Sequence, residues 1–216
     1  MECDPREHIR RAAASAMQMF YEVSCTSSEY VKRKLWLYAT APECPWCAAS
    51  EGCSLRGNGF YSRVEPAGTR IRRFLCRTVG RTVSLLPLCL ASHKTGSVDR
   101  MEEHAHSAES HSIYKVAQEV EFEGAAHGGG VPGRALYRQV TRSVVAVAVF
   151  LALMRGMWPD RFAHLRPRVS DFRRHLGTDR VLVELRSLFG EDLREAPTPI
   201  GLRRERISAQ LVAGYG

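Results

Sequence analysis

The sequence predicts an α+β protein in which a small, cysteine-framed antiparallel β module precedes a mostly α-helical domain. Cysteines at positions 44, 47 and 76 bracket two strand-like segments, residues 55–62 and 70–76, joined by a turn at Pro66 and Gly68. Further along, residues 134–157 have the apolar spacing of a long helix. In between, three consecutive glycines and a proline in residues 124–133 do not fit a regular element, so we expect a domain boundary there.

Residues 1–40 are expected to form an N-terminal helix and a strand that leads into the first cysteine pair. The helix is predicted from Pro5 to Val23, because apolar residues recur there at helical spacing. These residues are Ile9, Ala12, Ala13, Met17, Phe20 and Tyr21. Residues 34–39 alternate in polarity, which is typical of a short strand.

The β module is assigned to residues 41–95. A third strand is predicted over residues 82–86, and Pro87 ends it because proline cannot donate a hydrogen bond to a neighbouring strand. The next segment, residues 96–133, is acidic and rich in histidine, and it finishes with the glycine-rich linker.

The helical domain is assigned to residues 134–195, and residues 196–216 to a loose tail rich in proline and arginine. The long helix is expected to end before Pro159. Ser170 is the predicted N-terminal cap of a second helix, which Gly177 closes, and Asp179 is the predicted cap of a third.

Cysteine usage and hydropathy predict the setting of the protein. The 216-residue chain has seven cysteines, an odd number, and its first residues lack the apolar core of an export signal. We therefore expect reduced thiols in a cytoplasmic protein. The most apolar run, residues 144–154, is shorter than the roughly 20 residues that span a membrane. We interpret it as part of a core helix and expect no membrane partner.

The charge distribution favours a polyanionic partner. The formal net charge is +8, and residues 55–81 contain seven arginines against one acid, Glu65. Arginines interleaved with aromatic residues on a hairpin are typical of a surface that follows a phosphate backbone. The predicted nucleic-acid-binding residues are Arg56, Arg63, Arg70, Arg72, Arg73, Arg77 and Arg81. The alternative is a solvated surface, or one that pairs with the six glutamates of residues 101–133.

The cysteines of the β module predict a metal site. A tight turn can bring the thiols of Cys44 and Cys47 to one tetrahedral Zn²⁺, and Cys76 follows the hairpin as a third ligand. Two possibilities remain open for the fourth ligand: Cys53 from before the hairpin, or a residue from beyond it, Cys89 or His93. Loss of the site, with cysteines that are merely buried, is the other alternative.

Three stretches of this region have a recognisable pattern. They are Cys44-Pro45-Trp46-Cys47, residues 55–76 (LRGNGFYSRVEPAGTRIRRFLC) and residues 80–90 (GRTVSLLPLCL). Together they resemble the zinc-ribbon domain of bacterial insertion-element and transposase-like proteins. Two later stretches, residues 144–156 and 176–186, resemble the helical region that follows the ribbon in such proteins.

This resemblance implies a zinc-ribbon-like module with ligands Cys44, Cys47 and Cys76. The family's fourth ligand corresponds to Val79, which cannot bind a metal, and Val83 stands where the family has phenylalanine. The resemblance implies DNA transactions without a defined reaction.

No catalytic constellation is predicted. The aspartates lie outside apolar strands, where the metal-binding carboxylates of a DNA-cutting transposase are usually found. A cluster of histidines and glutamates is interpreted as an exposed acidic segment, with a metal site as the alternative: His104, His106, His111, Glu102, Glu103 and Glu109. We therefore predict a DNA-binding accessory or truncated transposase-like protein of a mobile element, without its own catalytic site and partnered by other proteins of that element. The alternative is a protein–protein interaction module built on a degenerate zinc ribbon.

Overall fold

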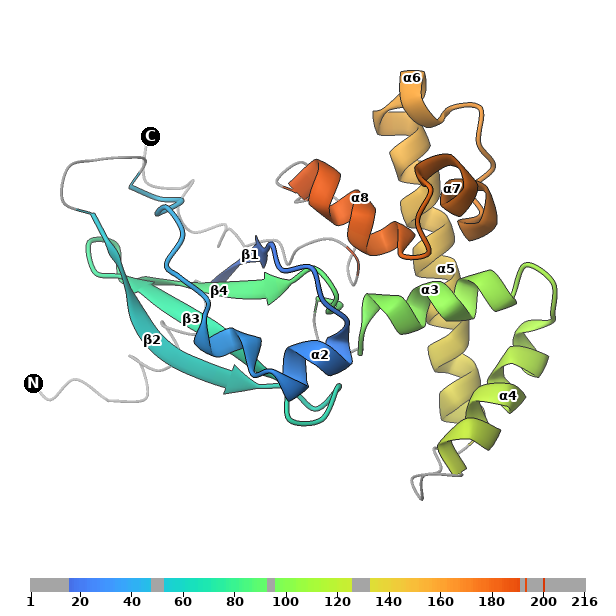
Figure 1. The fold of residues 1–216 in the computed structure, drawn as a ribbon, viewed down its shortest axis with the longest axis horizontal. Helices are drawn as coiled ribbons and strands as arrows, with labels where there is room; N and C mark the ends of the chain where they lie inside the picture. Colours follow the sequence, from blue (N-terminus) through green and yellow to red (C-terminus); the bar gives the residue numbers. More distant parts are fainter. Residues whose placement is uncertain are drawn as a thin grey trace, which may run out of the picture.

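The computed structural model describes residues 16–47, 53–92, 96–125, 133–190, 193 and 200. Over these residues the chain is an α+β protein, as predicted, with a β module beside a group of helices (Figure 1). The chain passes from the sheet to the helices after its last strand. The sheet consists of β1 (Ala16–Tyr21), β2 (Leu55–Ser62), β3 (Arg70–Cys76) and β4 (Arg81–Pro87).

The sheet has the strand order β1-β4-β3-β2. Strand β3 pairs antiparallel with β2 on one side and with β4 on the other, which confirms the three predicted strands. Strand β1 pairs parallel with β4, so the sheet is mixed and not purely antiparallel. Between Gly57 and Phe60 the register of β2 shifts against β3, because β2 holds one residue more than its partner over this stretch.

The N-terminal helix predicted from Pro5 to Val23 is wrong over the part that the structure describes. Residues 16–21 form β1, and residues 1–15 lie outside the described residues. In β1, Met17 pairs with Val83 and Met19 with Leu85, so β1 completes the hydrogen bonding of β4 on its second side. The apolar residues of this segment fit both the 3.6-residue period of a helix and the two-residue period of a strand. Pairing with β4 selects the strand.

The strand predicted over residues 34–39 is also wrong. The structure has helix α2 (Ser27–Lys32) and a 3-10 helix, η1 (Leu35–Leu37). A capping box begins α2, because the Thr26 side chain accepts from the Glu29 backbone while the Glu29 carboxylate accepts from the Thr26 backbone. Lys34 then takes a left-handed conformation, which separates the two helices.

Each face of the sheet has its own hydrophobic cluster. On one face, Ile71 and Leu86 pack with Tyr30 of α2 and with Leu35 and Trp36 of η1. On the other face, a second cluster joins strand residues to the segment that carries the first cysteine pair: Ala39, Leu55, Phe74, Cys76, Val83 and Leu85. Strand alternation separates the two sets of side chains.

The helices that follow are α3 (Val98–Ser107), α4 (Ile113–Ala125), α5 (Gly133–Met157), α6 (Pro159–Phe162), α7 (Val169–Leu176) and α8 (Val181–Phe189). The long helix predicted before Pro159 is confirmed as α5. Helix α3 packs on α5 in the main core, and α4 packs on the first half of α5. Residues 98–125 therefore belong to the helical part, and the change from sheet to helices lies near residues 88–98 and not in the glycine-rich segment.

The starts of α7 and α8 differ from the prediction. Neither Ser170 nor Asp179 is the N-cap, which is Arg168 in α7 and Arg180 in α8, without a side-chain hydrogen bond. Carboxylates from a distant part of the chain accept there instead. Glu102 of α3 accepts from the Leu182 backbone at 2.9 Å, and Glu109 accepts from the Ser170 backbone at 3.3 Å. An anion at a helix N-terminus satisfies free N–H groups and the helix dipole.

The end of α7 agrees with the prediction, because Gly177 closes the helix in a left-handed conformation. The acidic segment forms an ion pair with the helical part of the chain. Arg173 of α7 forms an ion pair of 3.0 Å with Glu102 of α3, whose carboxylate is buried. The acidic segment was interpreted as exposed, but Glu102 and His104 are both buried.

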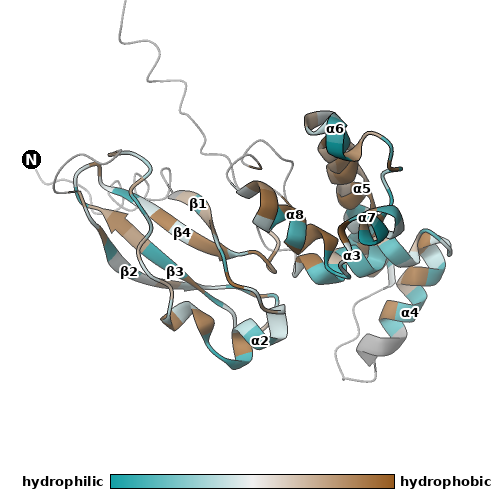
Figure 2. Cartoon of the chain, turned by 45° about the horizontal axis from the view of Figure 1, so that its top comes forward, coloured by the Kyte–Doolittle hydropathy of each residue, from teal (hydrophilic) through white to brown (hydrophobic). Residues whose placement is uncertain are grey.

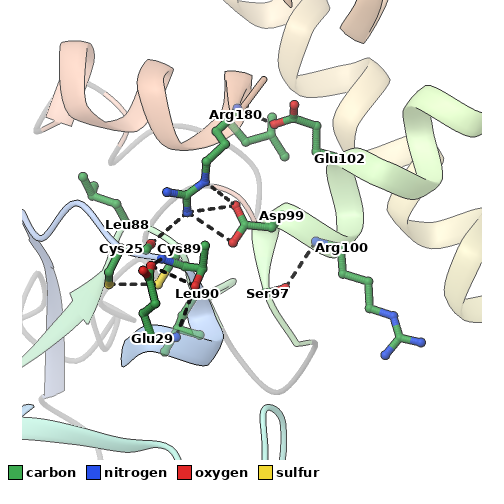
Figure 3. Close-up of polar contacts among 12 residues, drawn as sticks. Cys25, Glu29, Leu88, Cys89, Leu90, Ser97, Asp99, Arg100, Glu102 and Arg180 are labelled. Carbon is green, nitrogen blue, oxygen red and sulfur yellow. Dashed lines mark hydrogen bonds and ion pairs between the residues drawn. The ribbon is translucent and has the colours of Figure 1, made fainter. Parts of the chain in front are cut away.

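Arginines hold the β module to the helices. Arg180 forms an ion pair with Asp99 at 3.0 Å and donates to the Cys25 carbonyl at 2.8 Å, so it joins the residues before α2 to α3 and α8 (Figure 3). Arg186 of α8 is fully buried and donates to the carbonyl oxygens of Leu88, Leu90 and Ile200. Of the tail predicted to be loose, the structure describes Ile200, which is buried.

His104 makes the stability of the helical part depend on pH. Its side chain is 3% exposed, and neither ring nitrogen has a hydrogen-bond partner in the described part of the chain. Burial lowers the pKa of His104 from 6.5 to about 4. The neutral form is thus favoured in the folded state, and the unfolded state takes up the proton first as the pH falls.

We expect the protein to lose stability as the pH falls from about 6.5 to about 4, by roughly 3 kcal/mol from His104 alone. The measurement is the free energy of unfolding by urea at several pH values, for the wild type and for His104→Leu. The variant removes the effect of His104, while Glu102 and Asp99, whose pKa values burial raises, stay the same. Identical pH profiles for the two proteins would contradict this assignment.

Candidate metal centre

Four cysteine side chains come together at the open end of the β2–β3 hairpin. The Sγ atoms of Cys44, Cys47, Cys53 and Cys76 all lie within 4.8 Å of one another. The distance from the Cys76 Sγ is 3.6 Å to Cys47 and 3.7 Å to Cys53. Four sulfurs around a tetrahedral ion at about 2.3 Å lie roughly 3.8 Å apart, so the spacing suits a single ion. The cluster is positioned to hold a metal ion.

Each ligand has a defined place in the fold. Cys44 lies just before the turn at residues 45–47, Cys47 is the last residue of that turn, and Cys53 lies just before β2. Cys76 ends β3, where it pairs with Leu55 of β2 and Arg81 of β4. The hydrophobic cluster on this face of the sheet packs against all four cysteines, so the fold places the thiols together without the aid of a disulfide.

Cys53 supplies the fourth thiol. The resemblance placed the fourth ligand at Val79, but that side chain is 44% exposed in the turn between β3 and β4. Its backbone has a role, since the Val79 N–H donates to the Cys76 sulfur. Of the alternatives for the fourth ligand, Cys89 is buried elsewhere, against Cys25, and His93 lies outside the described residues.

Hydrogen bonds and burial shift the pKa values of two thiols of the cluster. The hydrogen bond from the Val79 backbone is the main reason that the pKa of Cys76 is lowered to about 6. The neighbouring Cys53 thiol and burial raise the pKa of Cys47 to about 12. Without a cation, the four thiols cannot all ionise side by side. A metal ion that binds here must release protons, so its affinity rises with pH.

The other cysteines and the histidine cluster lie apart from this site. The Sγ atoms of Cys25 and Cys89 are 4.0 Å apart at the junction with the helices (Figure 3). This contact raises the pKa of Cys89 and lowers that of Cys25. Among the described residues, no other group of three or more ligand side chains is close enough to hold a metal, which includes the predicted alternative around His104.

Three of the seven predicted arginines make contacts within the β module. Arg63 donates to the Ala91 carbonyl at 2.7 Å, and burial lowers its pKa. The Arg72 guanidinium lies 4.7 Å from the ring centre of Phe60 and 5.4 Å from that of Phe74. A Cβ at Gly57 would lie 2.7 Å from the end of this flexible guanidinium side chain. Arg81 lies 5.9 Å from the ring centre of Trp46, next to the metal cluster.

The remaining four arginines point toward solvent to different degrees. Arg56, Arg70 and Arg77 are exposed, and Arg73 is half-buried. Strand alternation puts Arg70 on the face that carries Cys76 and Arg73 on the opposite face. The hairpin therefore presents arginines on both sides, and not one continuous arginine face.

The sequence analysis missed a second basic group. Lys32, Arg33 and Lys34 are all exposed at the end of α2, close to Leu37 and Tyr38, which are 57% and 71% exposed. Helix α2 and η1 pack on the face of the sheet opposite the metal cluster. Three consecutive basic residues were the signal in the sequence.

Comparison with protein-family models, with curated proteins and with solved structures finds no match for this chain. The site is therefore described by its own geometry. Four cysteines from three segments of the β module converge on one point, and exposed basic residues lie on the same module: Lys32, Arg33, Lys34, Arg56, Arg70 and Arg77.

Proposed function

We propose that the chain is a zinc-stabilised nucleic-acid-binding protein, an accessory or truncated transposase-like component of a mobile element without its own catalytic site. The observation that carries the proposal is the cluster of four thiols at the end of an arginine-rich hairpin. A set of four thiolates with tetrahedral spacing is typical of structural zinc, and a closed set of protein ligands leaves no position for a substrate.

Zinc held by Cys44, Cys47, Cys53 and Cys76 would fix the hairpin rather than perform chemistry. It would tie the chain before β2 to the end of β3, so the strands that carry Arg56 and Arg70, and the turn after β3 that carries Arg77, keep a defined spacing. Exposed arginines and lysines on a rigid sheet suit a regular array of phosphates. The resemblance to zinc-ribbon domains of transposase-like proteins supports DNA as the polyanion.

The test is the salt dependence of binding to a labelled random-sequence duplex, followed by fluorescence anisotropy. Five phosphate contacts correspond to a slope of roughly −4 to −5 in log K against log salt concentration. We expect the triple variant Arg56→Gln, Arg70→Gln, Arg77→Gln to bind more weakly and to reduce the magnitude of this slope by roughly 3.

A matched control removes the same charge from the helical part. Arg161, Arg168 and Arg174 are exposed there, and their replacement by glutamine should leave the slope close to that of the wild type. Absence of binding at low salt would overturn the proposal of DNA binding. An equal loss in both triple variants would show a response to net charge alone and would count against the hairpin as the binding surface.

The second candidate function is a protein–protein interaction module. It is favoured by the adjacent exposed side chains of Leu37 and Tyr38, because exposed apolar and aromatic groups mark contact surfaces. If the chain does not bind DNA, Leu37→Ser and Tyr38→Ser should reduce the binding of a protein partner from the same element, while the zinc content stays unchanged.

A further inference from the structure

Helix α5 has an apolar face that the described part of the chain leaves open. In its most apolar window only 33% of the residues are buried, and by length and composition alone this helix could cross a membrane. Core helices pass the same test, and the buried side of α5 lies in the main core, as expected from the sequence: Val147, Phe150, Leu151 and Met154. The other side has no partner among the described residues.

The open face has a defined composition along the helix. Five exposed positions follow one stripe at helical spacing: Val145, Ala148, Val149, Ala152 and Gly156. Val145 and Val149 are 54% and 48% exposed, and Figure 2 shows the part of α5 next to α6 as hydrophobic. Toward the N-terminus the same stripe continues as Arg138 and Arg134, with Arg142 at its edge, all exposed.

Gly156 supports the view that this face is a contact surface. Gly156 lies in the last turn of α5, and glycine is less favourable in a helix than alanine. A Cβ at position 156 would have no heavy atom from another described element within 4 Å, so packing inside the chain does not require the glycine. Together with Ala148 and Ala152 it forms a row of small residues, four positions apart, over which a second helix can approach closely.

We propose that this face binds the same face of a second copy of the chain, as an antiparallel pair of α5 helices. A two-fold axis near Val149 would place the two apolar halves over one another. It would also bring Arg142 beside the C-terminal end of the other α5, whose dipole attracts a cation. Arg138 would then lie opposite Asp160 of the second copy, which follows α5 and is exposed.

Charge selects this arrangement over the alternatives. A parallel pair would place the three arginines of one copy next to those of the other, which is unfavourable. A membrane-surface helix needs apolar side chains along its whole length with the charges on the opposite side. In α5 the basic and the apolar residues follow one another along one stripe, so the antiparallel pair uses both.

The inference is tested by sedimentation of the full, metal-loaded chain over a wide range of concentration. One helix pair buries less than the roughly 1,200 Å² of a standard interface, so we expect a weak dimer in reversible equilibrium with monomer. Val149→Glu should weaken the dimer by at least about tenfold, because it buries an unpaired charge in each half of the interface. Val64→Glu is the matched control, since Val64 is an exposed valine of the β module, and it should leave the dimer unchanged.

A charge exchange tests the orientation of the pair. Arg138→Asp and Asp160→Arg should each weaken the dimer, and the double variant should restore it. A chain that is monomeric at every concentration overturns the proposal, and so does a dimer that Val149→Glu leaves intact. A monomer that instead binds anionic lipid vesicles through Val149 would show that a membrane surface occupies the face, and it also overturns the proposal. None of these outcomes depends on zinc or DNA binding, because α5 contains no cysteine of the cluster.

Discussion

One zinc ion per chain is expected in the purified protein, and its removal is expected to abolish the fold of the β module. Structural zinc in small modules binds with an apparent free energy of about 10–16 kcal/mol at neutral pH, and this energy is coupled to folding. Replacement of Cys53 or Cys76 by serine should therefore release the metal and lower the thermal transition. The measurements are zinc content by native mass spectrometry and thermal unfolding by circular dichroism.

Cys25→Ser is the control for these variants. Cys25 is buried in the same β module but contacts Cys89 outside the cluster, so its replacement should leave one zinc ion per chain. Cys53→Ser is the most informative variant, because the sequence leaves several candidates for the fourth ligand and the structure places the Cys53 thiol in the cluster. Full zinc occupancy in this variant would contradict the four-thiolate site. Zinc affinity should fall as the pH is lowered, because protons compete for the thiolates.

The second large effect is expected on the stability of the protein when Arg186 is replaced. Replacement by methionine keeps most of the side-chain volume but leaves the carbonyl groups of Leu88, Leu90 and Ile200 without this buried donor. We expect the free energy of unfolding to fall by about 3–5 kcal/mol, since each lost partner costs about 1–3 kcal/mol and the relief of a buried charge offsets only part of it. Urea denaturation measures the change.

Arg174→Met is the matched control for Arg186. The Arg174 side chain is 80% exposed and lies 3.9 Å from Asp171, so its loss should change stability by less than about 0.5 kcal/mol. Arg186→Lys should also destabilise the protein, because a single ammonium group cannot reach carbonyls that the two ends of the guanidinium reach separately. If Arg186→Met were as stable as the wild type, this result would contradict the view that the three carbonyl contacts of Arg186 hold the β module to the helices.

Short-range patterns in the sequence predicted much of the fold. The alternating segments and the turn between them identified β2, β3 and β4, and the apolar spacing before Pro159 identified α5. The capping box of Thr26 and Glu29 and the basic run of residues 32–34 are further local signals in the sequence. These features depend on neighbours within a few residues, so they are present in the sequence itself.

Contacts between distant residues decided the rest. Residues 16–21 became a strand because β4 had an unpaired side, and Glu102 and Glu109 replaced local caps because α3 crosses the starts of α7 and α8. Cys53 completed the thiol cluster through the packing of three segments, where spacing alone left several candidates.

The sequence by itself determined the α+β class, the hairpin and the long apolar helix, and it named the four cluster cysteines, with Cys53 as one of several candidates for the fourth. Only the tertiary structure decided the mixed sheet, the fourth cysteine, and which arginines make internal contacts and which remain exposed. It also showed that the described residues leave one side of α5 open. The physical reason is that periodicity and turn chemistry act locally, whereas burial and convergence of side chains depend on which segments meet in space.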